Sequence, residues 1–141
     1  MALTEDERKA VVLFRLNNAR QTLEDAKIIA ANKLWKASAN RLYYACYYAA
    51  SALMVKFGFE AKTHTGIIRL LGLNFISNNL INEELGDIYY KLFTLRQKGD
   101  YDDWIIVKES DIISLLEPAE QFITTVERVI NHDDKKDSMA L

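Results

Sequence analysis

Apolar residues recur every three or four positions along most of the chain, the spacing that places them on one face of an α-helix. In the first such row Val12, Leu16 and Ala19 are followed by further apolar residues at the same steps. Four segments carry a row of this kind and are predicted to be long helices, at about residues 5–32, 35–57, 83–98 and 110–131.

Polar residues and glycines indicate where the helices of the first half begin and end. Thr4 with Glu7 three positions later has the form of a capping box. Gly58 is expected to end the second long helix. Thr63 or Thr65 is expected to cap a short helix, because four apolar residues follow within the next eight positions.

The second half of the chain contains three further signals. Asn82 is expected to cap the third long helix and Gly99 to end it, so that residues 100–103 form a loop. Pro118 lies inside the last apolar row and should bend that helix without ending it, since the row continues beyond the proline. The charged residues from 133 onward are expected to form a frayed tail, 133–141.

These elements together predict the fold class. No segment shows the alternating pattern of a half-buried strand. We therefore predict an all-α protein, an antiparallel up-down bundle of four long helices plus one short helix. The helix at 35–57 should be central, because it is apolar over much of its circumference. A chain of 141 residues is one ordinary domain, which we expect to occupy residues 1–132.

Composition excludes several classes of protein. A single cysteine, Cys46, cannot form an internal disulfide, and only two histidines accompany it as metal ligands. No apolar run approaches the ~20 residues that span a bilayer. The N-terminus is acidic and does not resemble a signal peptide. We expect a cytoplasmic protein with no membrane contact, metal or cofactor.

The formal net charge of −2 conceals an uneven distribution. Residues 1–32 are neutral overall, residues 33–98 carry a net charge of +5, and residues 99–141 carry −7. A basic middle segment can mark a face that binds an anion or a nucleic acid. Alternatively, the acidic last helix packs against the basic helices and cancels their charge.

The first candidate site lies on the predicted helix 35–57. Steps of three and four place Arg41, Tyr44 and Tyr48 along one face. An arginine among tyrosines can hold a phosphate while the rings stack on a base. The alternative is packing, since tyrosines at helical spacing commonly fill a core or a dimer interface. This alternative applies best to Tyr43 and Tyr47.

The second candidate site is the segment from Lys62 to Gly66, which opens the short helix. Free backbone donors at a helix start favour an anion, and His64 could add a proton donor beside Lys62 and Thr63. The alternative is a simple helix cap in which His64 bonds to a neighbouring helix.

The third candidate site lies at the end of the third long helix. Arg96 and Lys98 precede Gly99, and Asp100 and Tyr101 follow it. Either these side chains form a binding site, or the two cations complement the helix dipole while Asp100 pairs with one of them.

Taken together, three segments resemble the HEPN domain family, above all its small stand-alone prokaryotic members. They are Asn40 to Ala45, Lys62 to Gly66 and Leu95 to Asp102, and the resemblance covers about residues 5–130. It implies an antiparallel bundle that is usually a homodimer. It further implies a toxin–antitoxin-type pair with a minimal nucleotidyltransferase.

Active ribonucleases of this family carry an arginine followed after four to six residues by a histidine, and they need no metal. Arg96 matches that arginine, but positions 101–103 hold Tyr101, Asp102 and Asp103. A tyrosine, with a pKa near ~10, is a poor replacement for a histidine in proton transfer. His64 is then the remaining candidate for that role. Tyr101 is the nearest analogue of a tyrosine that some partner transferases modify.

We favour a protein that binds a nucleotide or an RNA phosphate through Arg41, His64 and Arg96. One alternative is an active metal-independent ribonuclease toxin with an altered motif, in which Arg96 and His64 are catalytic. The other is a purely structural subunit that binds a partner protein.

Overall fold

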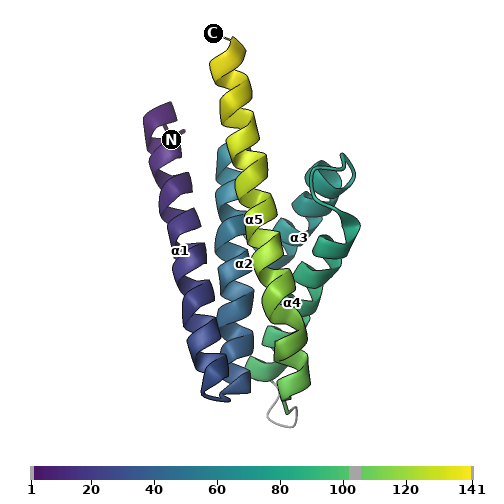
Figure 1. Cartoon of the computed structure of the whole chain (residues 1–141). Coiled ribbons are helices and arrows are strands. Elements are labelled where there is room, and N and C mark those ends of the chain that lie inside the picture. The colour runs from purple at the N-terminus through teal and green to yellow at the C-terminus, as the bar shows by residue number, and fades with distance from the viewer. Residues whose placement is uncertain (1, 102–105, 141) are drawn as a thin grey trace.

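The computed structural model describes residues 2–101 and 106–140, in which every regular element is a helix and there is no strand (Figure 1). The elements are α1 (Glu5–Ala31), α2 (Trp35–Phe57), α3 (His64–Leu71), the π-helical turn η1 (Gly72–Ile76), α4 (Glu83–Tyr101) and α5 (Glu109–Ala140). The four long helices alternate in direction, and the short α3 stands beside them. The predicted all-α bundle of four long helices and one short helix is confirmed.

The predicted caps of the first half are present. The Glu7 backbone N–H donates to Thr4 Oγ1 at 3.1 Å, and the Thr4 N–H donates to Glu7 Oε1 at 2.9 Å, which completes a capping box. Gly58 follows α2 in the left-handed region, at φ +77°, where a side chain would be strained. Thr63, rather than Thr65, caps α3.

The core is built around α2, which packs against α1 on one side and against α4 and α5 on the others (Figure 1). Small residues allow the close approach to α1, with Ala49 and Ala52 on α2 and Ala19 and Ala26 on α1 fully buried. Larger buried side chains such as Leu42 fill the space toward the other helices. Each fully buried leucine contributes about 1.5–3 kcal/mol to folding. The predicted central position of α2 is confirmed.

The predicted end of α4 at Gly99 is wrong. The helix continues to Tyr101, so Asp100 and Tyr101 are helical and lie one turn beyond Arg96. Gly99 is buried, and a Cβ added there would lie 3.4 Å from Val107 Cγ2. Gly99 is therefore a helical residue in van der Waals contact with Val107 rather than the end of the helix that we predicted. Asp102 and Asp103 lie outside the described residues.

The predicted end of the last helix near residue 131 is also wrong, because α5 continues to Ala140. No proline or glycine follows Pro118 to stop it, and Lys56 of α2 pairs with Asp133 at 3.3 Å and with Asp134. Pro118 lies inside the helix, as predicted. Although α5 is 32 residues long, neither it nor another described helix is long and apolar enough to cross a membrane.

The π-helical turn η1 was not predicted. The Ser77 N–H donates to the Gly72 carbonyl at 3.1 Å, the wider spacing that defines this turn. The turn directs Phe75 into the core, where its ring contacts Phe57 and Phe59. A five-residue segment of this kind has no period by which a sequence pattern could reveal it.

Candidate functional site

Arg96, near the end of α4, is almost fully buried, with 6% of the residue exposed. Its guanidinium carbon lies 4.9 Å from the ring centre of Tyr43 and 5.4 Å from that of Tyr44, both on α2. The ring of Tyr101 lies 5.9 Å from the same carbon. We call Arg96 with Tyr43, Tyr44 and Tyr101 the Arg96 centre. The three rings stabilise the cation by cation–π attraction.

The hydrogen bonding of the Arg96 guanidinium is incomplete. Asp100 Oδ2 lies 3.6 Å from Nη1, which is longer than the roughly 2.7–2.9 Å of a good charge-assisted hydrogen bond. The same oxygen accepts from Asn40 Nδ2 at 3.0 Å, which joins α4 to α2. Arg96 Nε is buried and has no hydrogen-bond partner among the described residues. A buried donor in this state is uncommon and needs an explanation.

Arg41 adds a second cation beside the Arg96 centre. Its guanidinium carbon lies 5.3 Å from the Tyr44 ring centre, so Tyr44 has a guanidinium against it from each of two helices. Arg41 Nε and Nη2 donate to Asn40 Oδ1 at 3.0 and 2.8 Å. The described hydrogen-bond partner of Arg41 is thus the neutral amide of Asn40. A neutral partner does not compensate the positive charge of the Arg41 guanidinium.

His64, at the start of α3, adjoins the same centre. Its Nδ1 lies 2.5 Å from the Tyr43 hydroxyl, and its ring stacks at 6.5 Å on Phe93. Burial, and then the positive charge of Arg96, lower the pKa of His64 below its ordinary value of 6.5. Burial raises the pKa of Tyr43 to about 12. A Tyr43 hydroxyl that donates to Nδ1 fixes the imidazole as the Nε2–H tautomer, which can donate to an anion.

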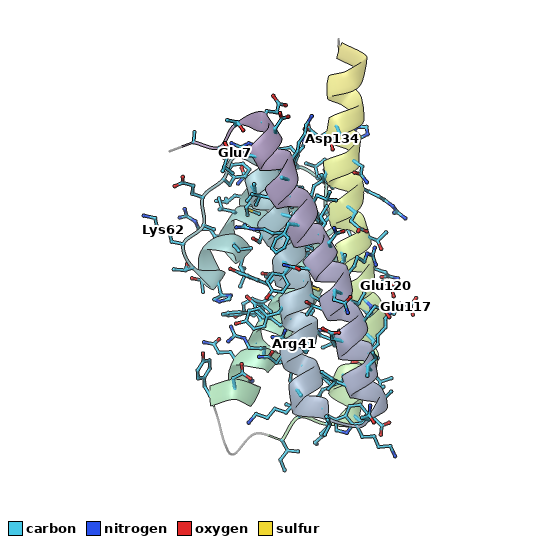
Figure 2. All side chains as sticks on the ribbon, turned by 90° about the vertical axis from the view of Figure 1, so that its left-hand side faces the viewer. Glu7, Arg41, Lys62, Glu117, Glu120 and Asp134 are labelled. Atoms are coloured by element: carbon cyan, nitrogen blue, oxygen red, sulfur yellow. The ribbon has the colours of Figure 1, made fainter. Side chains whose placement is uncertain are left out.

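The nine candidate residues divide into two groups. Arg96, Arg41, Tyr44, His64, Asp100 and Tyr101 come together at the contact of α2, α3 and α4. Lys62, Thr63 and Tyr48 do not contact Arg96. Thr63 Oγ1 accepts from the Gly66 N–H at 2.9 Å, so it serves as the cap of α3. Lys62 and Tyr48 line a neighbouring groove, and Figure 2 shows Lys62 well removed from Arg41 along the bundle.

Three residues that we had not assigned to a site contribute to it. Tyr43 and Tyr47, predicted to be packing residues, both contact His64, since the Tyr47 ring lies 4.8 Å from the imidazole. Asn40 bonds to both Arg41 and Asp100. The spacing of four between Tyr43 and Tyr47 shows that they share a helix face, but only the placement of α3 shows that this face meets His64.

The acidic end of the chain neutralises little of the basic middle segment. Glu120 and Glu127 of α5 pair mainly with Arg20 and Lys27 of α1. Of the nine cations in residues 33–98, Lys56 is the one with a described ion pair to α5. Asp100, which also belongs to the acidic segment, lies 3.6 Å from Arg96 Nη1. Charge cancellation by α5 therefore applies mainly to α1, and one carboxylate faces the two guanidinium groups of Arg41 and Arg96, so the net charge there stays positive.

The comparisons with known proteins agree with this fold. The HEPN domain family matches residues 12–129. A Thermotoga maritima relative named "UPF0332 protein" is 30% identical over 125 residues, covering 89% of this chain and 95% of the relative. Two Methanocaldococcus jannaschii relatives carry the name "Putative toxin". One is 34% identical over 113 residues, 79% of this chain and 83% of the relative. The other is 24% identical over 115 residues, 82% and 78% respectively. The chain belongs to the HEPN domain family.

Proposed function

We propose that the Arg96 centre binds a phosphate of a nucleotide or an RNA, within a toxin–antitoxin-type pair. One observation carries the proposal: a buried arginine whose Nε has no partner in the described structure and whose one described carboxylate contact is long, at 3.6 Å. A buried charge needs paired hydrogen bonds, and a phosphate supplies acceptor oxygens in the geometry that a guanidinium fits.

The surroundings of Arg96 suit a nucleotide better than a free anion. Arg41 adds a second positive charge, and His64 adds a neutral donor at neutral pH. The Tyr44 and Tyr101 rings offer faces on which a base can stack. Tyr101 is 77% exposed, so its side chain can turn away from Arg96 without breaking core packing and open a path to the guanidinium.

The biological setting is proposed from the family. Two relatives carry the name "Putative toxin", and the resemblance to small stand-alone HEPN proteins implies a minimal nucleotidyltransferase as the partner. We propose that this chain acts as a homodimer in such a pair. Tyr101, which is exposed and lies 5.9 Å from the Arg96 guanidinium carbon, is then the tyrosine for a partner to act on.

A metal-independent ribonuclease is the second candidate, and the position of His64 favours it. Tyr101 stands where the family motif has its histidine, but His64 adjoins Arg96 through Tyr43 and Tyr44. In the other tautomer Nδ1–H donates to the Tyr43 hydroxyl oxygen, and the free Nε2 of the neutral imidazole is then a suitable proton acceptor for a ribose hydroxyl. Cleavage of labelled RNA in the presence of EDTA, lost in His64→Ala, would support this role in place of binding alone.

The binding function is tested by titrating the purified full chain at low salt with a nucleoside monophosphate and with a short RNA. Wild type should bind saturably, and Arg96→Gln should bind about 10–100-fold more weakly. Arg69→Gln, an exposed change of equal charge on α3, should bind like wild type. Circular dichroism checks that each variant is folded. Equal binding by Arg96→Gln and wild type, or no binding by wild type, would rule the proposal out.

A further inference from the structure

A groove lies beside the Arg96 centre, between α1, α2 and the segment that leads into α3. Its volume of about 570 Å³ is within the range of roughly 300–1,000 Å³ typical of ligand sites. We call it the α1–α3 groove. Its aromatic and cationic lining residues are Phe14, Tyr47, Tyr48, Phe59, Arg15 and Lys62.

A row of tyrosine rings connects the groove to the Arg96 centre. Tyr47 lines the groove, and its ring lies 5.7 Å from Tyr44 and 4.8 Å from His64. Tyr48, also in the groove, lies 6.1 Å from Tyr44. The rings Tyr44, Tyr47 and Tyr48 are thus neighbours of one another on consecutive turns of α2. A ligand bound at Arg96 can therefore continue along these rings into the groove.

The groove is positively charged. Arg15 Nη1 donates to Ser51 Oγ at 2.5 Å, and neither Arg15 nor Lys62 forms an ion pair in the part of the chain that the structure describes. Glu60 is the one acidic residue in the lining. Two cations among four aromatic rings match an anionic ligand that also presents flat, stackable groups.

We propose that the α1–α3 groove holds the continuation of a single-stranded RNA, one phosphate of which is bound at the Arg96 centre. This inference rests on the proposed function and names its ligand class, an oligonucleotide rather than a mononucleotide. Sites for single strands combine a basic groove that follows the backbone with aromatic rings on which successive bases stack. Lys62 is the backbone contact and Tyr48 the stacking surface.

The test compares the affinities of a nucleoside monophosphate and an RNA hexamer for the full chain at several salt concentrations. Wild type should bind the hexamer at least tenfold more tightly. Lys62→Ala should weaken hexamer binding several-fold, by no more than about tenfold. The same change should reduce the salt dependence of hexamer binding by about one counterion. Tyr48→Leu should weaken hexamer binding about tenfold. Neither variant should change monophosphate binding, and Lys91→Ala, an exposed change of equal charge on α4, should change neither ligand.

Failure of this inference is distinct from failure of the proposed function. If the monophosphate binds and is lost in Arg96→Gln, but the hexamer binds no more tightly, the groove has no part in binding and only this inference is wrong. If neither ligand binds, both are wrong. If Lys62→Ala changes the oligomeric state and not hexamer affinity, the groove is an interface between copies of the chain, and the inference is again wrong.

Discussion

Two arginines lie at contacts between helices of this protein, and their bonding differs sharply. Arg20, where α1 meets α5, is paired with Glu127 through both Nε and Nη2, with Glu120 at 3.5 Å, and with the Thr124 hydroxyl at 3.0 Å. Its side chain is 36% exposed. Arg96 is less exposed to solvent than Arg20, at 6%, and has fewer hydrogen-bond partners, since its one described carboxylate contact is at 3.6 Å.

The difference shows what distinguishes a binding arginine from a structural one. Arg20 lies in a segment that is neutral overall and Arg96 in one with a net charge of +5, but both guanidinium groups are cations that need hydrogen-bond acceptors. The distinction lies in whether the protein itself satisfies the guanidinium. Arg20 is satisfied by α5, whereas Arg96 is surrounded by tyrosine rings and retains a buried donor without a described partner.

The largest expected effect is on ligand binding. Arg96→Gln should lower nucleotide affinity about 10–100-fold, because hydrogen bonds to charged groups contribute about 1.5–3 kcal/mol. Arg20→Gln should leave affinity unchanged. Isothermal titration calorimetry on both variants measures this. An equal loss of nucleotide affinity in both variants would contradict the claim that Arg96 binds the ligand and Arg20 does not.

The second effect concerns the stability of the α1–α5 contact. Arg20→Gln should lower the free energy of unfolding by about 1 kcal/mol or less, since its ion pairs are partly exposed. Urea denaturation measures the change. Arg20→Lys should retain part of the stability that Arg20→Gln loses. A loss of several kcal/mol would mean that Arg20, too, is a buried and critical charge.

The third effect tests the revised end of α4. Gly99→Ala should raise the free energy of unfolding by up to about 1 kcal/mol, because Gly99 is helical and a Cβ there meets only ordinary contacts, the nearest at 3.4 Å. Gly58→Ala, at φ +77°, should instead destabilise the protein by about 1 kcal/mol. Losses of the same size in both variants would indicate that the backbone of Gly99, like that of Gly58, is left-handed and that Gly99 ends the helix.

The smallest effect is a pH dependence that arises at His64. Burial and then Arg96 lower its pKa below 6.5, so below pH 6.5 the unfolded chain binds a proton that the folded chain resists. The free energy of unfolding should therefore decrease as pH falls from 6.5 to the lower folded pKa. Urea denaturation at pH 7 and pH 5.5 should show a smaller decrease in His64→Gln. An identical decrease would place the titrating group elsewhere.

The sequence allowed most of the fold to be predicted, because helical periodicity is a local signal. The capping box at Thr4 and the left-handed Gly58 both have signatures within a few residues. The two wrong helix ends have a different cause. Gly99 stays helical in α4, where it packs against Val107, and α5 extends past residue 131, where Lys56 binds Asp133. Both depend on contacts between distant segments.

The candidate site could be predicted by residue but not by arrangement. Arg41, His64 and Arg96 were all recognised from their local surroundings. The sequence could not reveal that Lys62 belongs to a neighbouring groove, because no residue pattern indicates the angle between α3 and α2. The same holds for Tyr43, whose hydroxyl meets His64 across the contact between two helices.

The most direct test of the account is an NMR measurement on arginine side chains. Nucleoside monophosphate is added to ¹⁵N-labelled protein, and the Nε–H signals of Arg96 and Arg20 are followed together. We predict a saturable shift at Arg96, whose Nε has no described partner, and none at Arg20, whose Nε donates to Glu127 Oε2 at 3.1 Å. An unmoved Arg96 signal at saturating ligand, or equal shifts at both arginines, would contradict the claim that Arg96 binds the phosphate.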